Sequence, residues 1–337
     1  MPLTSDLTIN YTRFDPDNTA KDTKEYSDLL EKATTATPNW WDVGAPRFRE
    51  MMEAGEISGL KPSRLPSAYD INLPSREPGR AIPVRVYQPA NGEPSQGILL
   101  HAHGGGYSLG SHDSIDDLLN FYATACRVTA MSVGYRLAPE HPWPAGAEDC
   151  IDAATYLADH GEADHGAKLS FLAGESAGAH LMALAAFALI RSRPRHELKG
   201  LVFPYGLYTM AMGLPSMVGF ERPILINEEM VRRFVDIVTP GWTVEARRRP
   251  LVSPLFEDLR ALAAMTPSGK LPPALFLCGT NDPLLDDTLL MGVKWLASGS
   301  EAVIKVFPGA PHVYNGGPID IAKESFEYEA EFLLGKM

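Results

Sequence analysis

The sequence of 337 residues has few cysteines, no long apolar run and no excess of positive charge. Its three cysteines, Cys126, Cys150 and Cys278, are widely spaced and odd in number, which favours reduced thiols over a disulfide framework or a zinc site. No uninterrupted apolar run approaches the roughly 18 residues that a membrane-spanning helix requires. The N-terminus, MPLTSDLTIN, lacks the basic and apolar regions of a secretory signal. We therefore expect a cytoplasmic protein without integral membrane association.

Acidic residues outnumber basic ones by 42 to 30, which gives a formal net charge of −12. This charge repels phosphate backbones and anionic lipid surfaces, so nucleic acid and peripheral membrane binding are disfavoured as main functions. Hydrophobic residues make up 45% of the chain and charged residues 21%, the balance of a globular protein with a substantial core. A neutral small molecule is the expected partner, and the oligomeric state cannot be read from the sequence.

Short β-rich runs alternate with longer helical patterns from about residue 80 onward. This alternation is typical of the α/β class, with a mostly parallel sheet flanked by helices. Most of the strand candidates are nearly continuous apolar runs, as expected for strands buried on both faces. The strand candidates are residues 82–87, 97–103, 127–134, 169–173, 200–205, 274–279 and 302–307. The helix candidates are residues 115–126, 145–160, 176–191, 283–298 and 320–334.

Two stretches, residues 1–60 and 207–265, carry helical patterns with little strand signal. The second separates two strands that a βα unit would join by fewer residues. We expect these stretches to form a helical cap over one α/β domain, which residues 61–206 and 266–337 make up. The alternative is that each stretch only covers an exposed edge of the sheet.

The run Gly174-Glu175-Ser176-Ala177-Gly178 lies directly between a strand candidate and an apolar helical run. A nucleophile elbow requires this context, because its serine sits on a strained turn and glycines two residues to either side relieve steric conflict. We predict that Ser176 is a nucleophile. An ordinary strand-to-helix turn is the alternative, since the GxSxG spacing alone is a weak signal.

A serine hydroxyl needs a general base, usually an imidazole that a carboxylate holds in one tautomer. In hydrolases with such an elbow, the acid and then the histidine follow the serine along the chain. Three histidines do so here: His180 lies in the helix that follows the serine, and His196 lies in a polar segment before the next strand. His312 follows the C-terminal end of a strand candidate, at the edge where the elbow emerges, so we predict that His312 is the base.

Three carboxylates compete for the role of the acid. Asp282 comes just after the strand candidate 274–279, at the same edge of the sheet, and is the predicted acid. Asp286 and Asp287 lie four and five residues later in a helical pattern, where their charge would favour the helix dipole. They remain the alternatives.

A glycine run, HGGGY at residues 103–107, follows another strand candidate. Glycine lets the backbone approach a substrate closely while it presents N–H groups, so we predict an oxyanion hole here. Its candidates are Gly104, Gly105 and Gly106, chiefly the last two, together with the amide of Ala177. A phosphate-binding loop is disfavoured because no Lys-Ser/Thr pair follows and the GxGxxG spacing is absent.

Five ordered motifs resemble the hormone-sensitive-lipase-like family of α/β-hydrolases, over roughly residues 80 to 320. They are HGGGY at 103–107, YRLAPEHPWPA at 135–145, GESAG at 174–178, DPLLDD at 282–287 and His312. The resemblance implies an α/β-hydrolase fold with a helical cap, carboxylesterase activity on short to medium acyl esters, and no cofactor or metal. It also implies a structural role for Arg136 and Glu140. Glu175, where Asp or Thr is more common, and Ala179, where glycine is common, weaken the assignment to a subgroup.

The expected function is that of a serine carboxylesterase, acting through an acyl-enzyme on short- to medium-chain or specialised-metabolite esters. A lactonase, an amidase or peptidase, and a ligand-binding or cyclase-like relative without this activity are the alternatives. Apolar residues of the two cap segments are expected to line the pocket, although each can equally be part of the core of the cap. They are Trp40, Trp41, Phe48, Met51, Met52, Met210, Met212, Met217 and Phe220.

Overall fold

A computed structural model describes residues 8–57 and 59–337. Residues 1–7 and 58, which belong to the predicted cap, lie outside the described residues. The described chain forms an eight-stranded sheet with the strand order β1-β2-β4-β3-β5-β6-β7-β8. The contacts of β2 with β1 and β4 are antiparallel, and all the others are parallel. The predicted mostly parallel sheet is therefore confirmed.

The strands agree closely with the apolar runs of the sequence. They are β1 (Tyr69–Pro74), β2 (Ala81–Tyr87), β3 (Ile98–Ala102), β4 (Thr129–Val133), β5 (Leu169–Gly174), β6 (Gly200–Pro204), β7 (Ala274–Asn281) and β8 (Ala302–Pro311). Strands β3 to β6 are buried along their whole length, because helices cover both faces of the sheet. The sequence did not predict β1, and β8 continues four residues beyond its predicted end.

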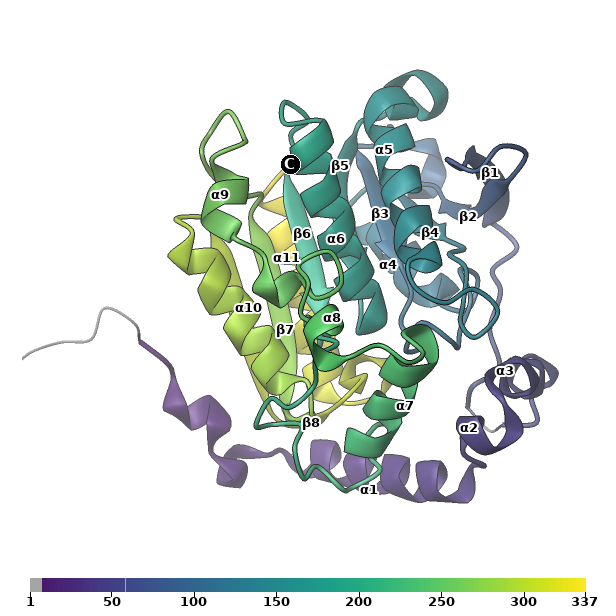
Figure 1. Ribbon diagram of the computed structural model, residues 1–337, viewed down its shortest axis with the longest axis vertical. Coiled ribbons are helices and arrows are strands. Elements are labelled where there is room, and N and C mark those ends of the chain that lie inside the picture. Colours follow the sequence, from purple (N-terminus) through teal and green to yellow (C-terminus); the bar gives the residue numbers. More distant parts are fainter. Residues whose placement is uncertain (1–7, 58) are drawn as a thin grey trace, which may run out of the picture.

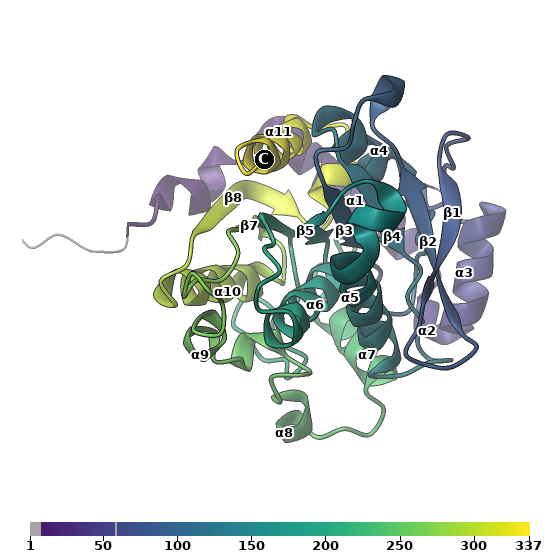
Figure 2. The same ribbon diagram turned by 90° about the horizontal axis from the view of Figure 1, so that it is seen from above.

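Helices pack on the two faces of the sheet, as Figure 2 shows. On one face lie α5 (Ala145–His165), α6 (Ala177–Ser192) and α10 (Leu285–Ala297), which contribute to the larger core cluster. On the other face lie α4 (Asp116–Ala125) and α11 (Asp320–Leu334), around a second cluster. Helix α6 is apolar on nearly every side, as expected for a helix buried all round.

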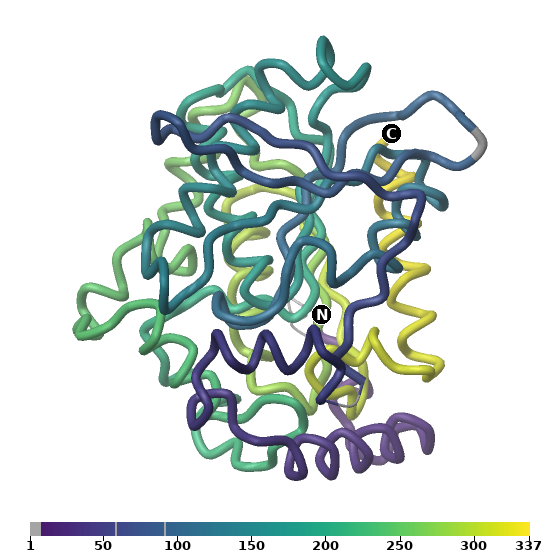
Figure 3. The backbone as a smooth tube through the Cα atoms, turned by 90° about the vertical axis from the view of Figure 1, so that its right-hand side faces the viewer, coloured from purple at the N-terminus to yellow at the C-terminus, as the bar shows by residue number. Residues whose placement is uncertain are grey.

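The two stretches predicted as a cap contain the remaining α-helices of the described chain. The first holds α1 (Lys21–Ala36), α2 (Trp40–Val43) and α3 (Ala45–Ala54), and the second holds α7 (Glu228–Val238), α8 (Val244–Arg247) and α9 (Leu259–Ala263). Helices α1, α2, α3 and α7 gather beyond one end of the sheet (Figures 1 and 3). Short 3₁₀ helices occur at Tyr11–Phe14, Pro16–Asn18, Ala90–Gly92, Pro254–Phe256 and Tyr314–Gly316.

No helix in the described part of the chain combines the length and the apolar character needed to cross a membrane.

Candidate active site

Ser176 lies on a sharp turn between β5 and α6, with φ 56° and ψ −118°. This conformation is costly for a residue with a side chain, so the surrounding packing must impose it. The two flanking glycines explain how the turn is accommodated. A Cβ atom at Gly178 would lie 1.9 Å from the carbonyl oxygen of Ala102 on β3, and one at Gly174 would lie 2.6 Å from the carbonyl carbon of Gly178. Both glycines are therefore required by close backbone contacts.

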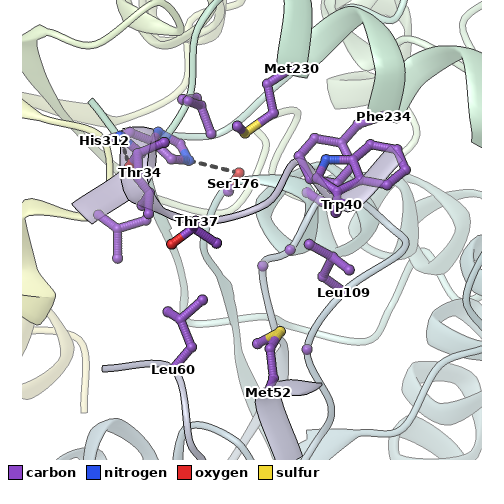
Figure 4. Close-up of a pocket in the computed structure, with 18 of the residues that line it drawn as sticks. Thr34, Thr37, Trp40, Met52, Leu60, Leu109, Ser176, Met230, Phe234 and His312 are labelled. Carbon is purple, nitrogen blue, oxygen red and sulfur yellow. Dashed lines mark hydrogen bonds between the residues drawn. The ribbon is translucent and has the colours of Figure 1, made fainter. Parts of the chain in front are cut away.

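His312 links the serine to a carboxylate (Figure 4). Its Nε2 atom lies 3.0 Å from Ser176 Oγ, and its Nδ1 atom lies 2.8 Å from Asp282 Oδ2. The other carboxylate oxygen of Asp282 accepts the amide N–H of Leu284 at 2.8 Å. Because β7 and β8 are neighbours in the sheet, the residues that follow them meet at one edge. The ring of Tyr205 packs edge-on against the imidazole of His312, with centroids 4.8 Å apart.

The two alternative acids have other partners. Asp286 accepts the amide N–H of Ser216, and Asp287 accepts the amide N–H groups of Tyr208 and Thr209. Asp287 is completely buried, and this burial raises the pKa of its carboxyl group to about 7. Both residues thus tie the start of the 207–265 stretch to α10.

The two other histidines that follow the serine bind backbone carbonyl groups. His180 Nε2 lies 2.7 Å from the carbonyl oxygen of Val252, and His196 Nε2 lies 2.9 Å from that of Leu169. Burial lowers the pKa of His180 to about 4, which keeps its ring neutral at physiological pH. Among the three candidates, only His312 is hydrogen-bonded to Ser176 through its side chain in the described structure.

The three glycines of the HGGGY loop are not equivalent. The amide N–H of Gly104 donates to Glu175 Oε1 at 2.8 Å, so it is already occupied. Within residues 8–57 and 59–337, the amides of Gly105 and Gly106 have no hydrogen-bond acceptor. Their φ angles are 103° and 58°, and a Cβ atom at Gly105 would lie 2.2 Å from the carbonyl oxygen of Leu109. The loop can therefore take this course only with glycine at that position.

Ser176 and His312 line a pocket of about 600 Å³. Helices α1 to α3 and α7 and the loops beside them contribute much of its wall, and the aromatic rings of Trp40 and Phe234 stack with centroids 4.6 Å apart (Figure 4). Phe234 also packs on the glycine loop, where a Cβ atom at Gly106 would lie 2.2 Å from its ring. The pocket wall is mainly apolar and joins both predicted cap segments.

Only part of the predicted pocket wall lines this pocket. Trp40, Phe48 and Met52 do so. The other six residues lie elsewhere: Trp41 and Met51 pack behind Trp40, Met210, Met212 and Met217 belong to the core beside the sheet, and Phe220 lines a separate hollow. The second segment instead contributes Leu207, Leu225, Ile226, Met230, Val231 and Phe234. For those six residues the prediction was wrong, because sequence shows neither which side of a short irregular segment faces inward nor which face of a short cap helix meets the pocket.

The 135–145 segment forms a buttress beside this site. Arg136 binds both carboxylate oxygens of the buried Asp149. Glu140 pairs with Arg49 on α3, and Arg49 also donates to the carbonyl oxygen of Ser108 at 2.7 Å. These contacts agree with the structural role that the resemblance implied for Arg136 and Glu140.

Comparisons with known proteins agree with this fold. A model of the alpha/beta hydrolase fold matches residues 99–315, well over half of the chain. The chain belongs to the α/β-hydrolase family. This hydrolase is 29% identical to an ethyl acetate hydrolase of Pseudomonas putida over 85% of its length and 88% of the relative's. It is 30% identical to a carboxylesterase of Mycobacterium tuberculosis over 69% and 71% of the two chains.

Solved structures extend the comparison. A hormone-sensitive lipase from a metagenome library superimposes with a TM-score of 0.76 over 95% of this hydrolase and 99% of that chain, at 23% identity, which establishes the shared fold. The resemblance to hormone-sensitive-lipase-like proteins and the predicted α/β-hydrolase fold are confirmed. The expected class, a hydrolase of carboxylic esters, agrees with the relatives as well.

Sequence reasoning missed one pair of buried polar residues in this hydrolase. In the sequence, Glu175 stands out only as a variation of the GxSxG motif, and His101 does not stand out. In the structure His101 Nε2 lies 2.6 Å from Glu175 Oε2, below the glycine loop. The available signal was a histidine inside an otherwise apolar strand, ILLHA, because a buried polar group needs a partner.

Proposed function

We propose that this protein is a serine carboxylesterase in which Ser176 is the nucleophile, His312 the general base and Asp282 the acid that orients it. The observation that carries this proposal is the continuous chain of hydrogen bonds, 3.0 Å and 2.8 Å long, that joins the three side chains below an apolar pocket. Such a chain supplies what a hydroxyl nucleophile lacks, a base held in one tautomer.

The reaction follows from these positions. Ser176 Oγ attacks the ester carbonyl carbon while His312 Nε2 takes the hydroxyl proton. When the tetrahedral intermediate collapses, the bond to the alcohol oxygen breaks and His312 returns the proton to that oxygen. A water molecule, activated by the same imidazole, then attacks the acyl-serine and releases the carboxylic acid. Asp282 stabilises the imidazolium that forms in both steps.

The negative charge on the carbonyl oxygen needs donors as it develops. We assign this role to the free amides of Gly105 and Gly106 and to the amide of Ala177, the first residue of α6. A helix N-terminus adds a favourable dipole at that point. Gly104 is left out because its amide donates to Glu175.

The pocket suggests the kind of ester that reacts. Its walls are formed mainly by leucine, isoleucine, valine, methionine and aromatic side chains, which favours neutral substrates with apolar acyl or alcohol groups. A volume of about 600 Å³ exceeds what an acetyl group needs, so short- to medium-chain esters and bulkier specialised-metabolite esters both fit. We assign residues 1–60 and 207–265 to the cap and the rest to the catalytic domain. A cytoplasmic location is supported by the three buried cysteines, none of which is in a disulfide.

The decisive experiment compares the wild type with Ser176→Ala on p-nitrophenyl esters of increasing acyl length. We expect hydrolysis by the wild type, labelling by a fluorophosphonate, and loss of both in the variant without loss of folding, because the hydroxyl removed is small. Activity close to wild type in folded Ser176→Ala would refute the mechanism. Lactones and an amide tested in the same series separate an esterase from the alternatives.

A further inference from the structure

Glu175 contacts both the nucleophile turn and the glycine loop. It precedes Ser176, and its backbone carbonyl accepts the amide N–H of Gly178 at 2.8 Å. Its side chain reaches in the other direction, where Oε1 accepts the amide N–H of Gly104 at 2.8 Å. The two chain segments are in contact here, because a Cβ atom at Gly104 would lie 3.2 Å from the carbonyl oxygen of Glu175.

His101 holds the second oxygen of this carboxylate. It lies on β3 opposite Ala173 of β5, one strand away from the nucleophile, and only 1% of its surface is exposed. Its Nε2 atom lies 2.6 Å from Glu175 Oε2. With one oxygen bound to His101 and the other to Gly104, the carboxylate has little rotational freedom.

These contacts fix the direction of the glycine loop. The amide plane of Gly104 is set by its bond to Glu175, and the next two amides, those of Gly105 and Gly106, are the free ones. A carboxylate held on both sides is a better anchor than a mobile one, because a catalytic donor must already point at the oxyanion before charge develops.

We propose that Glu175 and His101 form a positioning pair for the oxyanion hole, in which His101 orients the carboxylate and the carboxylate orients Gly104. This inference rests on the proposed function, since it assumes that Gly105 and Gly106 stabilise the oxyanion. Neither residue of the pair touches the reacting atoms. The pair acts through the loop, so its loss weakens stabilisation of the transition state more than it weakens substrate binding.

Glu175→Leu and Glu175→Gln separate positioning from packing. The leucine has similar bulk but accepts no hydrogen bond, and we expect kcat to fall about 100-fold with KM nearly unchanged, near the lower limit for loss of one oxyanion donor. The glutamine keeps an oxygen that can accept the Gly104 amide, and we expect it to retain kcat within about 10-fold of wild type. Affinity for a trifluoromethyl ketone, which forms a tetrahedral adduct, should fall in parallel with kcat/KM.

The order of action is tested by His101→Leu and the double variant. We expect His101→Leu alone to lower kcat about 10-fold. If His101 acts only through Glu175, the double variant His101→Leu/Glu175→Leu loses no more activity than Glu175→Leu alone. The matched control is Glu329→Gln, because Glu329 is another buried glutamate, hydrogen-bonded to Tyr122 and Ser325, and its change should alter kcat less than about 2-fold.

Three outcomes would contradict the proposed positioning role of this pair. They are a KM increase without a kcat loss in Glu175→Leu, equal losses in the leucine and glutamine variants, or additive losses in the double variant. Thermal unfolding of every variant identifies misfolding, and if Glu175→Leu does not fold, the His101→Leu and Glu175→Gln comparison decides. Activity that persists in Ser176→Ala would instead refute the proposed function and leave these contacts without a catalytic role.

Discussion

The floor and the roof of the pocket are held in place by different forces. The floor, which carries Ser176, His312 and the glycine loop, is fixed by buried strands and by backbone contacts so close that glycine is required. The roof, formed by α1 to α3 and α7, packs around a smaller apolar cluster that includes Trp40, Phe48 and Phe234, and ion pairs at the surface add to it. Arg222 pairs with Glu31 of α1, and both side chains are at least one third exposed. Catalytic geometry thus depends on the stable part, and substrate access on the part that opens at lower cost.

The largest expected effect concerns the floor. Asp282→Asn should lower kcat/KM about 10⁴-fold, because an amide at this position favours the wrong tautomer of His312. Asp286→Asn, four residues later, should cost less than about 10-fold, since the Asp286 carboxylate accepts the Ser216 amide N–H away from His312, and its own backbone N–H donates to Ser216 Oγ. Hydrolysis of p-nitrophenyl butyrate by both variants gives the comparison. A greater loss in Asp286→Asn would show that the acid was wrongly chosen.

Glycine substitutions test the packing of the two regions. Gly178→Ala should destabilise the protein by about 3 kcal/mol or more, because its Cβ atom would overlap the carbonyl oxygen of Ala102. Gly219→Ala, in the loop that leads into α7 of the roof, meets open space at φ 78° and should cost about 1 kcal/mol from backbone strain alone. Urea unfolding measures both. Similar costs at the two positions would contradict the contrast between floor and roof.

Asp287 on α10, which accepts the amides of Tyr208 and Thr209, gives stability a pH dependence. Burial raises the pKa of its carboxyl group to about 7, above the value of the unfolded chain, so the folded state binds the proton more tightly. As far as this group is concerned, the free energy of unfolding should be highest below about pH 4. It should fall as pH rises through about 7, with a total loss of about 2 kcal/mol and at most about 4 kcal/mol. Asp287→Asn should remove this loss.

Urea unfolding at pH 5 and pH 8 tests this expectation. Glu329 provides a second contribution of the same sign, because burial also raises the pKa of its carboxyl group to about 7. Asp287→Asn and Glu329→Gln should each flatten the slope, and the double variant should nearly abolish it. A wild-type protein that is more stable at pH 8 than at pH 5 would exclude both assignments.

The smallest expected effect concerns the roof alone. Arg222→Met removes the ion pair with Glu31 and should lower Tm by no more than about 2 °C, since exposed ion pairs contribute about 0–1 kcal/mol. Hydrogen exchange in α1 should accelerate while exchange in α6 is unchanged. The matched control, Arg193→Met, breaks a similar exposed pair with Asp159 away from the pocket and should not alter exchange in α1. Faster exchange in α6 would contradict the separation.

The sequence predicted the floor better than the roof, for physical reasons. Strands β3 to β6 are buried on both faces, so their composition is nearly all apolar and their ends can be located. Strand β1 is mostly exposed, and its sequence YDINLP alternates apolar with polar residues, so it lacks the continuous apolar run that marks the buried strands. The residues proposed for catalysis follow strand ends, and parallel strands bring such ends to one edge.

Most of the misassigned residues lie where no period constrains the chain. Met210 and Met217 were expected in the pocket but are completely buried in the core, because the irregular segment that carries them folds back under α10. The role of Gly104 was equally hidden, since it depends on which amide of three neighbouring glycines meets a carboxylate. Periodicity identifies buried faces but does not specify individual hydrogen bonds.

Much of the pocket wall comes from two pieces of chain that are distant in sequence, while the groups proposed for the reaction all lie on the sheet domain. This division makes the protein a suitable starting point for directed evolution. Libraries confined to residues 29–60 and 225–234 would sample new shapes of the binding space and leave the hydrogen bonds of Ser176, His312 and Asp282 untouched. Exchange of these two pieces between relatives, taken together because they meet at the pocket, would transfer substrate preference as a unit.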